Sequence, residues 1–161
     1  MNQYPLVYLD HVQKVYGKHI ALYDVSVNIQ PGRIIGLLGP NGSGKTTIIK
    51  LVNGLLQPTS GNVYIHGEVP SAKTKQVVSY LPDTTYLDEN MKISETLRFF
   101  QDFYKDFNVQ RAYQLLNDLQ LHPEQKLKQL SKGNKEKVQL ILVMSREADL
   151  YILDEPIGGV D

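Results

Sequence analysis

The sequence contains no cysteine, and its 161 residues carry no net charge, because 17 Lys and Arg balance 17 Asp and Glu. The lack of cysteine excludes a disulfide framework and is compatible with a reducing cytoplasm. The charge balance removes any global field that would attract nucleic acid, so we expect no nucleic-acid partner. No stretch reaches the roughly 20 apolar residues that span a bilayer, and the N-terminus lacks a signal-peptide pattern. A membrane role therefore requires a partner.

The strongest motif spans residues 39–46 and reads G-P-N-G-S-G-K-T. Its glycines allow positive φ and a close backbone approach, so that successive N–H groups point at phosphate oxygens. Lys45 is expected to reach the outer phosphates, and Thr46 to offer its hydroxyl to Mg²⁺. We call residues 39–46 the phosphate loop. The residues expected to hold a nucleoside triphosphate are Gly39, Pro40, Asn41, Gly42, Ser43, Gly44, Lys45, Thr46 and Thr47.

The residues around the phosphate loop predict the strand-loop-helix context that this motif requires. Residues 33–38, R-I-I-G-L-L, predict a buried strand. Residues 47–56 predict a helix, because apolar side chains recur there at helical spacing. The positive N-terminal end of that helix would face the bound anion.

The remaining pattern has a β-rich start, an α/β core and a helical insertion. Alternation and turn residues predict strands at 4–12, 21–29, 63–65, 77–81 and 150–153. A turn is expected at Tyr16-Gly17-Lys18. Helices are expected at 93–107, with Ser94 as N-cap, at 109–121, and from 131–134 to about 147. The fold class is therefore α/β.

Two carboxylates follow the last predicted strand. Residues 150–153 are apolar and lead into Asp154-Glu155, at the strand end where ligands of open α/β sheets bind. Asp154 can hold Mg²⁺ through water, and Glu155 can orient or deprotonate the water that attacks a γ-phosphate. Alone, this pair is more typical of an ordinary strand end. Together with the phosphate loop it indicates nucleotide hydrolysis.

A third stretch, Leu130-Ser131-Lys132-Gly133-Asn134, precedes a predicted helix and forms a second potential anion site. With the phosphate loop and residues 150–156, it resembles the ATP-binding cassette (ABC) ATPases over essentially the whole chain. This resemblance implies a P-loop NTPase core with a RecA-like parallel sheet, an N-terminal antiparallel β subdomain and an inserted helical subdomain. Residues 1–82 and 148–161 would form the core and β subdomain, and residues 83–147 the Q-loop equivalent and helical subdomain.

The resemblance also implies ATP and Mg²⁺ as ligands and assigns roles to individual residues. Tyr16 matches the aromatic residue that stacks on adenine, although it could also pack locally within a hairpin. The signature motif, which contacts ATP bound to the opposite subunit, and the loop that crosses the dimer interface also have matching positions. The implied catalytic residues are Glu155, Lys45 and Asp83; the metal ligands are Thr46, Asp154 and Asp83; the signature residues are Ser131, Lys132, Gly133 and Asn134; and the interface residue is Asp161.

Two stretches depart from the family pattern, at Asp83 and in the signature residues, which read Leu-Ser-Lys-Gly-Asn in place of Leu-Ser-Gly-Gly-Gln. Asp83 stands where the family usually has Gln, which adds a third carboxylate near Asp154 and Glu155. It could bind the metal directly, take up a proton or swing away. Lys132 replaces the usual Gly and resembles variants of export-type subunits. It could equally belong to the solvated lysines between residues 126 and 137.

The implied protein is the ATP-hydrolysing subunit of an ABC transporter, with Lys132 favouring export. It would lie at the cytoplasmic face of the cell membrane, with transmembrane permease subunits and a second ABC ATPase subunit as partners. Aromatic residues of segment 93–107 would either receive the permease or form the helical subdomain's own core. The alternatives are a soluble ABC ATPase that switches on nucleic acid or ribosomes, and a regulatory dimer with negligible ATPase activity.

Family members continue beyond the position of Asp161 and include a switch histidine. The four histidines here, at 11, 19, 66 and 122, all precede Asp154. We therefore expect this sequence to represent part of a longer chain. Taken alone, its residues are expected to bind nucleotide weakly and to hydrolyse it hardly at all.

Overall fold

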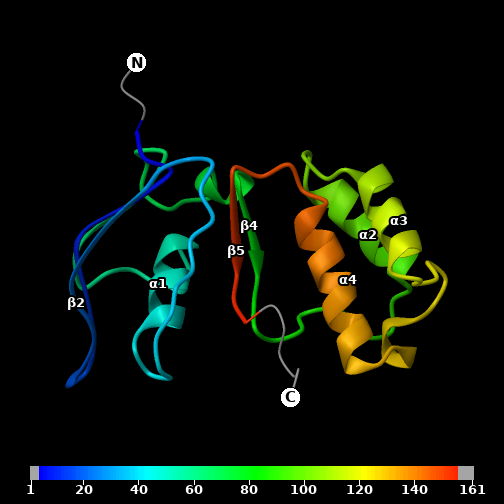
Figure 1. The fold of residues 1–161 in the computed structure, drawn as a ribbon, viewed down its shortest axis with the longest axis horizontal. Helices are drawn as coiled ribbons and strands as arrows, with labels where there is room; N and C mark the ends of the chain where they lie inside the picture. Colours follow the sequence, from blue (N-terminus) through cyan, green and yellow to red (C-terminus); the bar gives the residue numbers. More distant parts are fainter. Residues whose placement is uncertain (1–3, 156–161) are drawn as a thin grey trace. The chain divides into compact units, whose positions relative to one another are not determined.

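The computed structural model describes residues 4–155, and the chain divides into two compact units, Met1–Val78 and Ser79–Asp161. Figure 1 shows the antiparallel strands and α1 in the first unit and the helices α2 to α4 in the second. The fold is mixed α/β, as predicted. Asp161, the predicted interface residue, lies outside the described residues.

The first unit contains an antiparallel sheet of β1 (Val7–Tyr16), β2 (His19–Ile29) and β3 (Ser60–Ile65), in the order β2-β1-β3. The N-terminal antiparallel β subdomain is therefore confirmed. β1 and β2 form a hairpin in which Tyr16 pairs with His19, and Gly17 in the turn has a φ of 59°. Both strands are longer than predicted, because register shifts interrupt the alternation on which the prediction depended.

α1 (Lys45–Val52) begins directly at the phosphate loop and is shorter than the predicted helix over 47–56. It buries Ile49, Leu51 and Val52. Gly54, with a φ of 65°, turns the chain away, so that Leu55 stays exposed. The helix therefore ends at Val52, before the exposed Leu55.

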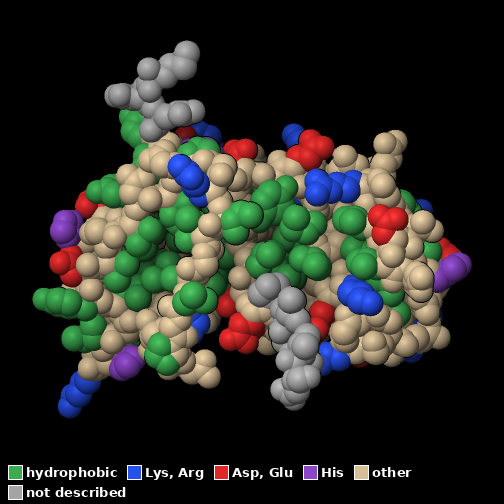
Figure 2. Space-filling view, viewed as in Figure 1, with side chains coloured by type: hydrophobic (Ala, Val, Ile, Leu, Met, Phe, Trp, Pro, Cys, Tyr) green, Lys and Arg blue, Asp and Glu red, His purple; other side chains and the backbone are tan. Residues whose placement is uncertain are grey.

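The buried strand predicted at residues 33–38 is wrong: this segment has no regular structure and is exposed along its length. Leu38 is 91% exposed, and Ile34 is fully exposed. Hydrophobic side chains are correspondingly visible on the surface of the first unit in Figure 2. Among the described residues no strand pairs with this segment, and a strand needs a neighbour to satisfy its backbone hydrogen bonds.

A small sheet consists of β4 (Val78–Leu81), which begins at the last residue of the first unit, and β5 (Leu150–Leu153) of the second unit. The two strands run in the same direction in Figure 1. The Asp154 amide donates to the Leu81 carbonyl oxygen at 2.9 Å, where both strands end. Residues that follow β4 and β5 therefore leave the sheet at the same edge.

Three helices of the second unit share one apolar core: α2 (Ile93–Phe103), α3 (Val109–Asp118) and α4 (Lys132–Met144). Each contributes a stripe of fully buried side chains, including Leu97, Leu116 and Leu142. The buried Ser79 hydroxyl donates to the Val143 carbonyl oxygen at 2.9 Å, which ties β4 to α4. The short 3₁₀ segments are η1 (Thr74–Gln76) in the first unit and η2 (Leu127–Gln129) in the second.

The predicted N-cap of α2 is wrong. Lys92 occupies that position, and Glu95 accepts a hydrogen bond from the Lys92 amide at 2.7 Å. Ser94 lies inside the helix, where its hydroxyl donates to Glu124 at 3.1 Å. Across residues 4–155, no helix combines the length and apolar character needed to span a membrane.

Candidate nucleotide-binding site

The backbone of the phosphate loop is shaped around its glycines. Gly44, the N-cap of α1, has a φ of 93°, which favours glycine strongly. A Cβ atom at this position would lie 2.6 Å from Leu22 Cδ2 and 2.7 Å from the Ala21 carbonyl oxygen. At Gly39 a Cβ atom would lie 2.6 Å from the Ser43 hydroxyl. The loop therefore adopts a turn that side chains at these positions would prevent.

Lys45 lies over this turn. Its Nζ donates to the carbonyl oxygens of Gly39, at 2.6 Å, and Pro40, at 3.0 Å. The first N–H groups of α1 lack partners within the helix and carry its positive dipole end. No acidic residue lies in the first turn of α1. The ammonium group, the helix end and the exposed Thr46 together form a cationic, donor-rich surface suited to a polyphosphate.

Tyr16, the last residue of β1, also belongs to the first unit. Its ring is 44% exposed, and Lys14 Nζ lies 5.2 Å from the ring centroid. This contact is within the range of a cation–π interaction. The ring thus has one local partner and still presents area to solvent.

The second unit brings Asp83, Asp154 and Glu155 to the edge where β4 and β5 end. Asp154 is 7% exposed, whereas Asp83 and Glu155 are exposed. Burial, and then the negative charges of Asp154 and Asp83, raise the pKa of Tyr80 above its ordinary value of 10. Glu155 has a φ of 46°, which is uncommon for a non-glycine residue.

The predicted metal ligands offer oxygen donors of the kind that Mg²⁺ prefers. Within residues 4–155, no group of three His, Cys, Asp or Glu side chains is arranged to hold a metal by itself. Mg²⁺ is typically bound by one or two carboxylates together with substrate phosphates. Asp83 and Asp154 are two such carboxylates within the second unit, and Thr46 offers a hydroxyl oxygen in the first unit.

The predicted signature residues lie at the start of α4. Ser131 is the N-cap and accepts a hydrogen bond from the Asn134 amide at 3.3 Å. Ser131, Lys132 and Gly133 are exposed, and no atom lies within 4 Å of a Cβ built at Gly133. Lys132 Nζ lies 3.9 Å from a Glu136 carboxylate oxygen, so this lysine has a local partner. The helix start is open to a ligand from outside the unit.

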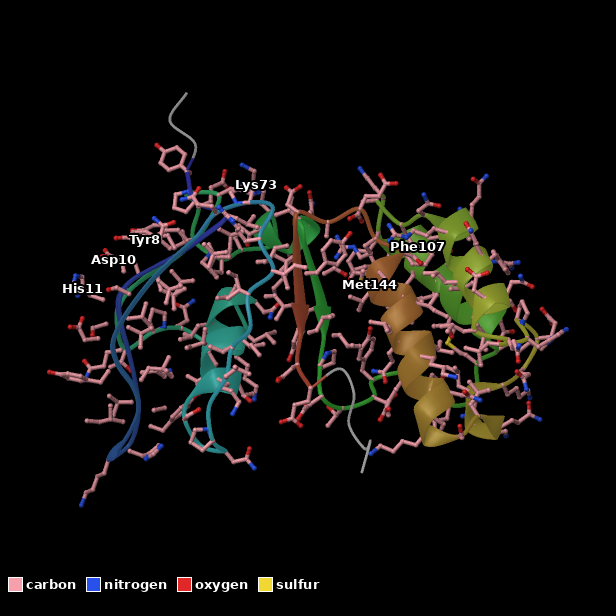
Figure 3. All side chains as sticks on the ribbon, viewed as in Figure 1. Tyr8, Asp10, His11, Lys73, Phe107 and Met144 are labelled. Atoms are coloured by element: carbon pink, nitrogen blue, oxygen red, sulfur yellow. The ribbon has the colours of Figure 1, made fainter. Side chains whose placement is uncertain are left out.

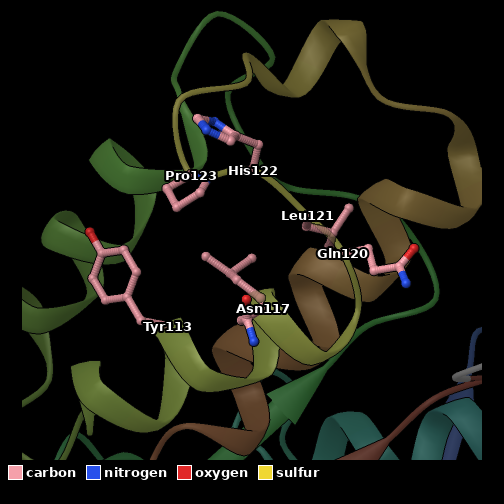
Figure 4. Close-up of a pocket in the computed structure, with 7 residues that line it drawn as sticks. Tyr113, Asn117, Gln120, Leu121, His122 and Pro123 are labelled. Carbon is pink, nitrogen blue, oxygen red and sulfur yellow. The ribbon is translucent and has the colours of Figure 1, made fainter.

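The structure contains two features that the sequence analysis did not predict. A shallow pocket of about 330 Å³ lies along α3 and the segment after it, and Asn117 and His122 are among its lining residues (Figure 4). An ion pair joins buried Arg146 to half-buried Asp106. No pattern identifies this pair, because its members are forty positions apart.

Comparisons with known proteins identify the family of this chain. The family model described as "ABC transporter" matches residues 22–158. The chain is 36% identical over 163 residues to the SkfA peptide export ATP-binding protein SkfE of Bacillus subtilis, covering 97% of this chain and 68% of that protein. It is 32% identical over 176 residues to the zinc import ATP-binding protein ZnuC of Hydrogenovibrio crunogenus, covering 100% of this chain and 64% of that protein.

A solved structure described as the ATP binding subunit of an ABC transporter is similar with a TM-score of 0.87 and 30% sequence identity. The similarity covers 97% of this chain and 68% of that chain. The chain spans 53% to 68% of the length of eight curated relatives that it matches.

Proposed function

Because the chain belongs to the family of ABC transporter ATP-binding proteins, we propose that it is the ATP-binding and ATP-hydrolysing part of a transporter subunit. The observation that carries this proposal is the phosphate loop, in which Gly44 is confined to a left-handed turn and the Lys45 ammonium lies over the loop carbonyls. The β4–β5 pair belongs to a RecA-like core in this proposal. Residues 1–82 and 148–161 form the core and β subdomain, and residues 83–147 the Q-loop equivalent and helical subdomain.

ATP binding rests on residues 39–47 and Tyr16. In the bound state, Lys45 exchanges its two carbonyl partners for phosphate oxygens, and the first N–H groups of α1 donate to the same phosphates. The exposed face of the Tyr16 ring stacks on adenine. These contacts account for ATP binding alone and not for its hydrolysis.

Hydrolysis rests on Glu155. Its carboxylate accepts a proton from water as the water oxygen bonds to the γ-phosphorus, and the bond from that phosphorus to the β–γ bridging oxygen breaks. Thr46, Asp154 and Asp83 would hold Mg²⁺, which would supply neutralising charge on the phosphates. Asp83, exposed after β4, takes the place of the family's usual Gln.

Dimer formation rests on the start of α4 and on Asp161. Ser131, Lys132, Gly133 and Asn134 contact ATP held by the second subunit, and the exposure of the first three supports that role. Two ATP molecules shared across the interface then drive closure of the pair. Closure moves the permease subunits, and hydrolysis resets them.

Permease contact rests on the aromatic end of α2. Segment 93–107 divides its aromatic residues between the two roles considered for it: Phe100 and Phe107 are buried in the helical core, while Phe99 and Phe103 are 58% and 69% exposed. The exposed pair is the permease contact in this proposal. The subunit is then peripheral, at the cytoplasmic face of the membrane.

Export is the proposed direction of transport, on the basis of Lys132. The relatives include a peptide export protein and a zinc import protein, so family membership is compatible with both directions.

The test is steady-state ATP turnover by the full-length protein with Mg²⁺. Glu155→Gln should lower kcat by about 10²-fold or more, the usual scale for losing a general base. The matched control is Glu147→Gln, since exposed Glu147 lies outside the site and keeps an oxygen to accept from Asn108. Equal turnover in the two variants would reject the proposed hydrolysis.

A second variant resolves the role of Asp83. Asp83→Gln should retain ATP binding and change kcat, because it removes a carboxylate from the edge that carries Asp154 and Glu155. Turnover equal to that of the wild type would show that Asp83 lies outside the site.

A further inference from the structure

The second unit contains a cluster around a buried arginine that the proposed mechanism does not use. Arg146, 3% exposed, donates from Nε and Nη2 to the two carboxylate oxygens of Asp106, at 3.1 Å and 2.9 Å. Its guanidinium carbon lies 3.9 Å from the centroid of the Tyr104 ring. We call Tyr104, Asp106 and Arg146 the arginine cluster.

The contacts of the arginine cluster restrict the orientation of the Arg146 guanidinium and also pair its charge. A planar guanidinium that both pairs bidentately with a carboxylate and stacks on a ring has little freedom to rotate. Burying a charge pair costs desolvation energy that apolar side chains would not incur. The cluster is therefore better explained by what it positions than by stability alone.

On one side, the arginine cluster contacts the exposed aromatic end of α2. The rings of Phe103 and Tyr104 meet edge to face with centroids 4.8 Å apart. Phe99 stacks on Phe103 at 6.2 Å. A protein bound over Phe99 and Phe103 would therefore contact side chains that pack directly on the Tyr104 ring.

On the other side, the arginine cluster contacts the strand that carries the site carboxylates. The Tyr151 hydroxyl donates to the Arg146 carbonyl oxygen at 2.5 Å and accepts from the Ala148 amide at 3.2 Å. Tyr151 lies in β5, three residues before Asp154. This hydrogen bond joins the Arg146 backbone to β5, the strand that leads into Asp154 and Glu155.

Backbone hydrogen bonds join the same segments. The Asn108 amide donates to the Ser145 carbonyl oxygen at 2.7 Å, and the Glu147 amide to the Asp106 carbonyl oxygen at 3.0 Å. Phe107 and Met144, labelled in Figure 3, mark this junction between the α2–α3 connection and the end of α4. The arginine cluster therefore lies within a continuous set of contacts from α2 to β5.

We propose that Arg146 is a positioning residue, which holds β5 so that Asp154 and Glu155 act on ATP and which transmits contact at Phe99 and Phe103 to them. This inference rests on the proposed function, because it assumes that Glu155 supports hydrolysis. Arg146 itself touches neither nucleotide nor metal.

The test is kcat and KM for Mg-ATP in the full-length protein. Arg146→Lys retains the positive charge beside Asp106 but loses the fork and the planar stack. We expect kcat to fall on the order of fivefold to tenfold, with KM changed less than about twofold. The matched control is Arg111→Lys, at an exposed position on α3, which should change neither constant.

Tyr104 variants provide a second readout if Arg146→Lys folds poorly. Tyr104→Phe keeps the ring against the guanidinium and should retain kcat, whereas Tyr104→Leu removes it and should lower kcat as Arg146→Lys does. A purely structural cluster would lower the amount of folded protein and leave kcat per folded molecule unchanged.

Unchanged kcat in both folded Arg146→Lys and folded Tyr104→Leu would overturn the inference. A rise in KM without loss of kcat would do the same, because it would assign Arg146 to nucleotide binding. Failure of the proposed function gives a different result, in which Glu155→Gln turns over ATP as fast as the wild type.

Discussion

The helices of the second unit and residues 33–38 of the first unit differ in how far their apolar side chains are buried. In the second unit, α2, α3 and α4 bury their apolar stripes in a shared core. In the first unit, residues 33–38 carry four large apolar side chains, yet they are exposed. A helix satisfies its backbone hydrogen bonds internally, whereas a strand depends on a neighbour. Apolar content therefore predicts burial only where the partner surface is also present.

The largest effect expected from this contrast concerns stability. Leu97→Ala, at a fully buried position on α2, should lower the free energy of unfolding by about 3 kcal/mol, because it removes apolar contacts and leaves a cavity. Ile34→Ala, in the exposed segment, should change it by less than about 0.5 kcal/mol. Urea unfolding followed by circular dichroism measures both. Comparable losses would mean that residues 33–38 are packed in solution.

Two glycines of the phosphate loop sharpen the contrast within the first unit. Gly44→Ala adds a Cβ atom that meets Leu22 and Ala21, so we expect a loss of about 2 kcal/mol or more in the free energy of unfolding and weaker nucleotide binding. Gly42→Ala, with a φ of 81° but no atom within 4 Å, should lose only about 1 kcal/mol from backbone strain. Equal losses in thermal unfolding would show that the close approach at Gly44 does not exist.

A smaller effect separates structure from function at the start of α4. Ser131→Ala should cost about 1 kcal/mol, the usual value of an N-cap. Ser131→Asp keeps a capping oxygen, so stability should change little, but its charge should repel a phosphate and lower ATP turnover. If Ser131→Asp turns over ATP as fast as the wild type, Ser131 caps α4 but does not contact a phosphate.

Elements that depend on local pattern were predictable, and elements that depend on distant partners were not. The hairpin at Gly17, the helices of the second unit and the strand before Asp154 follow from local spacing and turn residues. The strand predicted at 33–38 failed because its pairing is not local. The Arg146–Asp106 pair could not be predicted, because neither residue belongs to a motif and only the fold brings them together.

The phosphate loop and the carboxylates after β5 were predictable because their chemistry lies in consecutive residues. The structure adds what spacing does not contain, namely that Lys45 lies on its own loop carbonyls and that Asp83 and Asp154 both influence Tyr80. The division of aromatic side chains along α2 also required the structure, since helical spacing alone does not say which side is covered.

The smallest expected effect concerns pH. The hydrogen bond that His11 Nδ1–H donates to Asp24, together with the negative charge of Asp24, raises the pKa of exposed His11 above 6.5. The ion pair therefore stabilises the first unit fully below pH 6.5, and this contribution is lost as the pH rises through the raised pKa. His11→Gln should reduce the fall in melting temperature across that range, and Asp24→Asn should act alike. An unchanged pH profile in both variants would show that the pair is not formed in solution.

The most direct test of the account is equilibrium binding of ATP, with Mg²⁺, to the full-length protein and to two lysine variants. Lys45→Ala should weaken binding by about 10-fold to 100-fold, the equivalent of a lost charged hydrogen bond, because it removes the ammonium over the phosphate loop. Lys50→Ala, at an exposed position in the last turn of the same helix, should bind as the wild type does. Equal affinity in the two variants, or no binding by the wild type, would contradict the assignment of residues 39–46 as the ATP site.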